Sequence, residues 1–257
     1  QFNLYCAKQF MDRKYWETAA AKPYGELIFD VLGNNSNKNI VNAITELAAP
    51  NKSVADIGCA AGRWLPLLAT GFKKVYAVDI AEKYLQTAKE KNKRFKNIQY
   101  IRADFSKTKK GVPACHVVIS INAILTPDAK SRHACFKNIA ATVKKGGHLV
   151  FVCPALESAV FSQFIFNHWN STTGKFEPAR TENTANSKNV FDGLIKLDGT
   201  YTKHYLEEEL KFILTTYGFQ VLKAEKVEYN WNTEFTEPPA WLKEPRPWDW
   251  LVVAKRM

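Results

Sequence analysis

The sequence predicts an α/β fold in which parallel strands alternate with helices, and two apolar runs carry that prediction. The run at 53–57, Ser-Val-Ala-Asp-Ile, contains Asp56 near its end and is followed by a glycine-containing turn. The run at 75–80, Val-Tyr-Ala-Val-Asp-Ile, carries Asp79 near its end. The two acids are separated by close to the ~20 residues that a strand, a turn, a helix and a second strand consume. The spacing therefore indicates one βαβ unit with an acid at the tip of each strand.

The turn after the first strand favours a cationic nucleoside as its ligand. It reads Gly58-x-Ala60-x-Gly62, with Asp56 two residues before the first glycine. Glycine lets the backbone approach a ligand where a Cβ would collide. Dinucleotide sites instead show G-x-G-x-x-G against a pyrophosphate, and a carboxylate here would repel phosphate but attract a ligand that carries an amino group. Asp79, at the tip of the next strand, can accept hydrogen bonds from both hydroxyls of a ribose.

This turn resembles the first motif of the class I S-adenosylmethionine-dependent methyltransferases, acid-x-Gly-x-Gly-x-Gly, with Ala60 in place of the middle glycine. The resemblance runs from Lys52 to the C-terminus. The segments that resemble the third to seventh strands of that family are 97–105, 115–122, 143–153, 220–228 and 250–255. The resemblance implies an α/β fold with a doubly wound, Rossmann-like sheet of seven strands, parallel except for an antiparallel last strand.

The resemblance also implies S-adenosyl-L-methionine as the cofactor. Asp104 would then meet the adenine amino group, Phe105 would lie against the ring, and the fourth strand would end under the sulfonium. The residues expected to bind the cofactor are Asp56, Gly58, Cys59, Ala60, Gly62, Asp79, Ile80, Asp104, Phe105, Ser120 and Asn122. Any one acid at a strand end can equally cap the following helix. Three such acids in order, each after an apolar run, favour the cofactor site.

Three further segments are candidates for covering the substrate, because open α/β sheets bind ligands beyond the carboxyl ends of their strands. Residues 1–32 are rich in aromatics and have helical spacing at 25–32, which predicts an N-terminal lid ahead of a catalytic domain at 33–257. Residues 230–248 hold three tryptophans, one phenylalanine and four prolines. Their aromatics can wall a pocket or simply pack.

The insertion at 154–201 is the longest of these segments, where a minimal fold needs only a short connection. Apolar residues at helical spacing predict a helix at 155–169, followed by a polar loop at 170–189. Asp192-Gly193 predicts a hairpin within 190–197. Together these features predict a cap over the active site, although the apolar stripe of the helix can equally cover the sheet edge.

The polar side chains best placed for catalysis are Asn122, just past the fourth strand, and His204 with Tyr205, after the insertion. Methyl transfer from a sulfonium is an in-line displacement, so a base is optional and depends on the acceptor. His133 and His168 are further candidates. The residues expected to contact the substrate are Tyr15, Tyr24, Trp169, His204 and Tyr205.

Ser-Ile-Asn-Ala at 120–123 departs from the Asn/Asp-Pro-Pro-aromatic sequence of methyltransferases that act on base or amide nitrogens. That departure argues against nucleobase and glutamine methylation. The leading expectation is a methyltransferase for a small molecule. A methyltransferase for RNA or protein and a cofactor-binding module without catalysis are the alternatives.

The composition is that of a globular protein with an excess of basic residues. The formal net charge is +11, which would suit an acidic partner such as RNA. However, lysines outnumber arginines and fall mostly on expected helix faces and loops, so nucleic acid is not favoured. No stretch approaches the ~18 apolar residues of a membrane span, and residues 1–10 lack a signal-peptide pattern. The five cysteines show no C-x-x-C spacing, which predicts reduced thiols in a cytoplasmic protein and no metal site. We also expect a monomer or a homodimer.

Overall fold

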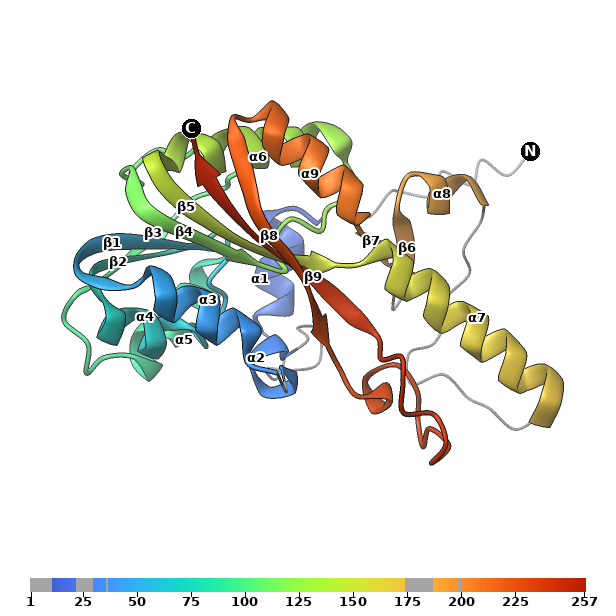
Figure 1. The fold of residues 1–257 in the computed structure, drawn as a ribbon. Coiled ribbons are helices and arrows are strands. Elements are labelled where there is room, and N and C mark those ends of the chain that lie inside the picture. The colour runs from blue at the N-terminus through green and yellow to red at the C-terminus, as the bar shows by residue number, and fades with distance from the viewer. Residues whose placement is uncertain (1–10, 22–29, 36, 174–186, 198–199) are drawn as a thin grey trace, which may run out of the picture.

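The computed structural model describes residues 11–21, 30–35, 37–173, 187–197 and 200–257 (Figure 1). In chain order the elements are α1 (Arg13–Ala19), α2 (Val31–Asn34), α3 (Asn39–Leu47), β1 (Ala49–Ile57), α4 (Leu65–Gly71), β2 (Phe72–Asp79), α5 (Glu82–Lys91), β3 (Ile98–Arg102), β4 (Cys115–Ile121), α6 (Ala129–Thr142), β5 (Val143–Pro154), α7 (Leu156–Thr173), α8 (Ser187–Phe191), β6 (Leu194–Leu197), β7 (Thr200–Lys203), α9 (Glu207–Thr216), β8 (Phe219–Glu228), the 3₁₀ turn η1 (Trp231–Thr233) and β9 (Trp248–Arg256).

The seven-stranded sheet has the order β3-β2-β1-β4-β5-β9-β8. Strands β1 to β5 pair in parallel, and β9 is antiparallel to both β5 and β8. The predicted doubly wound sheet with an antiparallel last strand is confirmed. The winding reverses between β1 and β4, and this is where open α/β sheets place their ligands.

Helices cover both faces of this sheet, which explains why its central strands are apolar on both sides. On one face lie α3, α4 and α5, which bury residues such as Ile44 and Leu68 against it (Figure 1). On the other face lie α6 and α9, which contribute Ile139 and Leu214. The result is a three-layer domain whose carboxyl strand edge remains open to other segments.

Helix α7 follows β5 directly and confirms the helix predicted at 155–169. It extends away from the sheet (Figure 1). Its Phe161 and Trp169 pack against the segment at 230–247, where Trp231 and Phe235 stack with ring centroids 5.2 Å apart. Several aromatics of that segment therefore form a small core with α7.

The hairpin predicted around Asp192-Gly193 is wrong. Residues 187–191 form α8, and the Gly193 amide closes its end on the Val190 carbonyl at 2.8 Å. Gly193 has φ +67°, the conformation that commonly ends helices. The hairpin present in the structure is β6 with β7, which pairs Leu194 with Lys203. Most of the helix predicted at 25–32, and residues 174–186 of the predicted loop, lie outside the described residues.

Candidate active site

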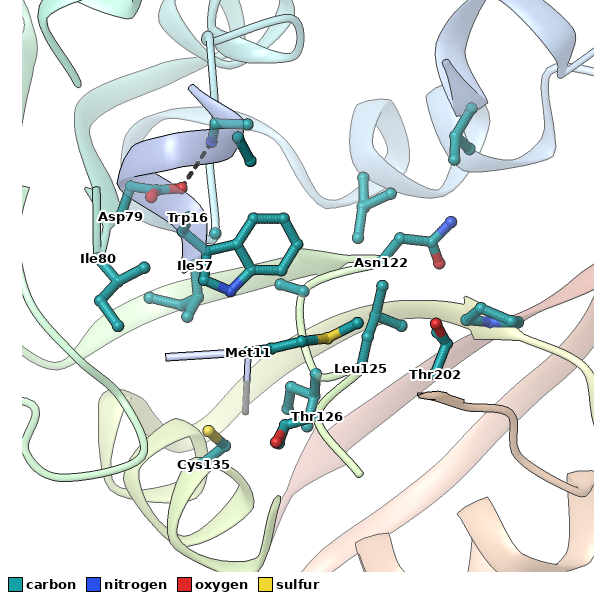
Figure 2. Close-up of a pocket in the computed structure, with 18 of the residues that line it drawn as sticks. Met11, Trp16, Ile57, Asp79, Ile80, Asn122, Leu125, Thr126, Cys135 and Thr202 are labelled. Carbon is teal, nitrogen blue, oxygen red and sulfur yellow. Dashed lines mark hydrogen bonds between the residues drawn. The ribbon is translucent and has the colours of Figure 1, made fainter. Parts of the chain in front are cut away.

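A cavity of about 1360 Å³ runs along the carboxyl edge of the sheet. Its wall comes from the turn after β1, the ends of β2 and β5, the loops after β3 and β4, the start of α7, the β6–β7 hairpin and the start of β9. Helix α1 adds Trp16, whose indole lies between Asp79 on one side and Asn122 on the other in Figure 2. The cavity thus occupies the edge at which the sequence predicted a ligand.

The turn after β1 is shaped by residues with positive φ. Gly58 has φ +81° and donates its amide to the Val78 carbonyl at 2.8 Å. A Cβ at position 58 would lie 2.3 Å from the Cβ of Ala123, so only glycine lets the turn and the loop after β4 approach this closely. Packing explains the glycine at position 62, which does not line the cavity. A Cβ there would clash with the side chains of Leu65 and Ala88.

Asp79 lines the cavity together with Ile80, and its carboxylate fixes the turns on either side. It accepts hydrogen bonds from the amides of Ala60 and Ala81, both at 2.9 Å. Burial raises the pKa of Asp79 to about 6, against the lowering effect of these hydrogen bonds. Asp79 is thus ionised at neutral pH and lies where a ribose acceptor was predicted.

Asp56 and Ser120 do not line the cavity. The carboxyl group of Asp56 is 2% exposed, and its Oδ2 has no hydrogen-bond partner among the described residues. Burial, with a smaller effect from nearby Asp79, raises the pKa of Asp56 to about 8. At pH 7 the group is mostly protonated, so the predicted attraction between a carboxylate at Asp56 and a cationic ligand is not supported. The hydroxyl of Ser120 is similarly buried.

Asp104 and Phe105 line the cavity beyond β3, next to the end of β2. The Asp104 carboxylate accepts the Ser106 amide at 3.0 Å and pairs with Lys107 at 3.2 Å. Phe105 is buried, and its carbonyl accepts the amide of Asn138 at 2.8 Å. The structure therefore brings this predicted acid and ring to the same half of the cavity as Asp79. Cys59 and Ala60 also line it.

At the other half, Asn122 meets an acid that sequence reasoning missed. Asn122 has φ +49°, and its Nδ2 donates to Oδ2 of Asp249 at 3.0 Å. The hydroxyl of Tyr229 donates to the same oxygen at 2.9 Å. Because β9 runs antiparallel, its first residues reach the edge where the parallel strands end. An acid at the start of the predicted antiparallel strand was the signal that could have found Asp249.

The predicted catalytic and substrate residues are only partly brought together. His204 lines the cavity, with Nδ1 3.1 Å from the Thr202 carbonyl oxygen. Tyr205 does not line it: the side chain is fully buried, and its hydroxyl donates to the Ile124 carbonyl at 2.8 Å. Trp169 packs against Trp241 instead of lining the cavity.

Tyr15 lines the cavity, whereas Tyr24 lies outside the described residues. The two further histidines are elsewhere. His133 contacts the Tyr217 hydroxyl at 2.9 Å, and His168 is exposed and stacks on Phe164. The sequence had placed these side chains only by their order along the chain, which does not determine their direction.

Helix α1 is fixed to the domain by Glu17. Its carboxylate accepts the amides of Glu82 at 2.8 Å and Lys83 at 3.3 Å, in the first turn of α5. Trp16 packs on a cluster that includes Ala81 and Tyr84. Helix α1, which falls within the predicted N-terminal lid, therefore lies over the half of the cavity next to β2.

Among the residues that the structure describes, no group of three or more His, Cys, Asp or Glu side chains is arranged to hold a metal ion. None of the described helices is long and apolar enough to cross a membrane.

Comparison with known proteins finds a methyltransferase domain in part of the chain. A family model described as a methyltransferase domain matches residues 54–147, which span β1 to the start of β5. No curated protein sequence matches the chain. Among solved structures, the fold is similar to that of a SAM-dependent methyltransferase from Methanosarcina mazei, with a TM-score of 0.59 and 17% identity over 83% of this chain and 96% of that one.

Two other similar structures were solved with S-adenosylhomocysteine. The N-methyltransferase NodS from Bradyrhizobium japonicum has a TM-score of 0.60 and 14% identity over 95% of this chain and 97% of that one. The 1,6-didemethyltoxoflavin-N1-methyltransferase from Burkholderia thailandensis has a TM-score of 0.62 and 13% identity over 95% and 87%. Residues 54–147 thus match a methyltransferase domain, and the chain shares its fold with S-adenosylmethionine-dependent methyltransferases, which supports S-adenosylmethionine as the cofactor.

Proposed function

We propose that the protein is an S-adenosylmethionine-dependent methyltransferase that acts on a small-molecule acceptor, which sits beside the cofactor in the cavity. The size and extent of the cavity support this most directly. Pockets for one small ligand commonly measure ~300–1,000 Å³, and this cavity measures about 1360 Å³. It reaches from Asp79 at the end of β2 to Asp249 on β9. Four strand spacings of ~4.8 Å separate those strands, or roughly 19 Å, which leaves room for two ligands side by side.

The residues of the β2 half fit the adenosyl part of the cofactor. Asp79 offers a carboxylate for the ribose hydroxyls, while Phe105 and Ile80 offer apolar surface for the adenine ring. The backbone at Gly58 and Ala60 has positive φ and lines the cavity without a large side chain. When bound, the cofactor supplies an electrophilic methyl group.

The residues of the β9 half fit an acceptor. Polar groups come from Asn122, His204 and Asp249, while Leu125 and Trp248 provide apolar wall. Figure 2 shows Asn122, Leu125 and Thr202 on this side. In-line methyl transfer needs an aligned nucleophile in a water-poor site. Helix α1 and the β6–β7 hairpin supply wall residues that would exclude water from two sides.

Binding of S-adenosyl-L-homocysteine tests the cofactor half. Asp79→Ala removes both acceptors for the ribose, so we expect at least a tenfold loss of affinity, since hydrogen bonds to charged groups contribute about 1.5–3 kcal/mol. Calorimetric titration measures it, and thermal unfolding checks that the variant is folded. Asp128→Asn, at the N-cap of α6 and outside the cavity, is the control. Equal affinity in Asp79→Ala and wild type would contradict the assignment.

The acceptor class is tested by incubating the protein with cofactor labelled in the methyl group and a cell extract. The extract is divided into small molecules, RNA and protein. We expect the label in the small-molecule fraction, and much less label there with the Asp79→Ala variant at a subsaturating cofactor concentration. Label confined to RNA or protein would overturn the proposal, and cofactor binding without any transfer would favour a binding module.

A further inference from the structure

The acceptor half of the cavity is acidic. Asp249 and Glu234 line it, and among the described residues no lysine or arginine does. The cationic residues that line the cavity come from α1 and from the turns after β1 and β3; they are Lys14, Arg63 and Lys107. An acceptor that carries a carboxylate or phosphate would find no opposite charge in this half and would be repelled by Asp249.

Asp249 is fixed in place by donors from two other segments. Asn122 Nδ2 and the Tyr229 hydroxyl both donate to its Oδ2, at 3.0 and 2.9 Å. Asp249 is only 8% exposed, yet it lines the cavity. Burial, and the nearby Asp249 charge, raise the pKa of Tyr229 well above its ordinary value, so the hydroxyl keeps its proton and remains a donor. Both donors therefore hold the carboxyl group of Asp249 in one orientation.

A second, independent feature is an unpartnered oxygen beside this carboxylate. The Asn122 amide has its nitrogen on Asp249, and this contact fixes which way the amide points. Its Oδ1 is buried and has no hydrogen-bond partner among the described residues. Buried polar atoms without a protein partner are commonly completed by a ligand or an ordered water. The pair of Asn122 and Asp249 thus offers oxygens that accept hydrogen bonds, while its own donors are already engaged.

We propose that the methyl acceptor is a basic nitrogen compound, a primary or secondary amine, whose N–H group is held by Asp249 beside the end of β4. This inference rests on the proposed function, because it names the acceptor class for the same cavity. An amine arrives as an ammonium ion and gives one proton to the Asp249 carboxylate. Its nitrogen lone pair then forms the bond to the methyl carbon, and the bond from that carbon to sulfur breaks with its electron pair left on sulfur.

The test compares Asp249→Asn with wild type, using the small-molecule fraction of a cell extract and methyl-labelled cofactor. We expect labelled products that are retained on a cation exchanger. The fraction of untreated extract that gives rise to these products, used as the source of acceptor, should show a roughly 10- to 100-fold lower kcat/KM with Asp249→Asn, because a charge-assisted hydrogen bond is lost. Affinity for S-adenosyl-L-homocysteine should stay within about twofold. Asp192→Asn, an exposed acid in the turn after α8, is the matched control and should behave as wild type.

Tyr229→Phe keeps the inference testable if Asp249→Asn fails to fold. It removes one of the two donors that orient Asp249, so kcat/KM for the acceptor should fall severalfold while affinity for S-adenosyl-L-homocysteine stays within about twofold. A merely structural role would lower both together.

Three results would overturn the inference. Labelled small molecules without a basic nitrogen would contradict the amine acceptor but leave the proposed function standing. Equal losses of turnover and cofactor affinity in Asp249→Asn would also contradict the amine acceptor alone. Absence of label from every small molecule would overturn both.

Discussion

Asp56 and Asp79 lie near the ends of neighbouring parallel strands, and their burial links folding to pH. Burial raises the pKa of Asp56 to about 8 and that of Asp79 to about 6, from an ordinary value of 3.8. At pH values between the ordinary pKa and the raised pKa, each of these two carboxyl groups keeps its proton in the folded protein but loses it in the unfolded chain. Stability contributed by these groups is therefore fully present below pH ~4 and is lost as pH rises toward 8.

Replacement of Asp56 by asparagine should reduce this dependence. Asp56→Asn cannot ionise, so we expect its free energy of unfolding to fall less than that of wild type between pH 5 and 8. The difference should be roughly a few kcal/mol at most, since one pKa unit corresponds to about 1.4 kcal/mol. Urea denaturation at both pH values measures it. A parallel fall in the two proteins would show that Asp56 ionises normally.

Comparing Gly58 with Gly146 distinguishes the cost of a steric clash from the cost of backbone strain. Both have positive φ, at +81° and +72°. A Cβ at 58 would lie 2.3 Å from Ala123, whereas none of the described atoms lies within 4 Å of a Cβ at 146. Alanine at either position carries the left-handed penalty of about 1–2 kcal/mol, but only position 58 adds a clash at the cavity.

We therefore expect Gly58→Ala to lose more stability than Gly146→Ala and also to lose affinity for S-adenosyl-L-homocysteine. Gly58→Val, with a larger side chain, should abolish binding. Gly146→Ala should keep it. Denaturation and calorimetric titration of the three variants measure both effects. Unchanged affinity in Gly58→Val would mean that the turn after β1 does not contact the cofactor.

At the scale of elements, α1 and α5 depend on each other. Helix α5 begins at Glu82 after Ala81, which has no side chain to cap it. Glu17 of α1 supplies the missing acceptor for the first two amides, and those bonds help to lower its pKa although burial opposes them. A carboxylate at a helix N-terminus is also favoured by the helix dipole. One side chain thus caps α5 and holds α1 over the cofactor half of the cavity.

Glu17→Ala should release α1. We expect faster hydrogen exchange in α1 and in the first turn of α5, and a loss of about 0.5–2 kcal/mol of stability, as for other lost caps. Cofactor affinity should also fall, because α1 carries Trp16 into the cavity wall. Glu90→Ala, an exposed acid on α5, is the matched control. Exchange rates that are equal in the two variants would contradict this link.

At the scale of the whole molecule, the cavity joins elements from most of the sheet. Ligand bound there stabilises the folded state by mass action. S-Adenosyl-L-homocysteine at 100 times its Kd should add about 2.7 kcal/mol and raise the Tm by roughly 5–10 °C. Differential scanning calorimetry measures the shift, which Asp79→Ala should reduce at the same ligand concentration. No shift with wild type would contradict cofactor binding in the native fold.

The succession of strands along the chain, the turn after β1 and the acids at the ends of β2 and β3 could be predicted from the sequence. These features are local. Apolar runs predict the strands, and the residues at the end of a parallel strand lie at the carboxyl edge of the sheet regardless of which segments pack against that edge. The N-terminal lid as a separate unit, the cytoplasmic location and the monomer or homodimer remain predictions.

The directions of side chains were decided by tertiary packing. Asp56 is near a strand end like Asp79, yet it points into the interior, where burial keeps it mostly protonated at pH 7. Tyr205 follows His204 directly, but it faces the core while His204 faces the cavity. Asp249 reaches Asn122 across 127 positions of sequence only because an antiparallel strand begins where parallel strands end. Local sequence sets which segments become strands and turns, whereas the contents of the site depend on contacts between segments that only the folded sheet brings together.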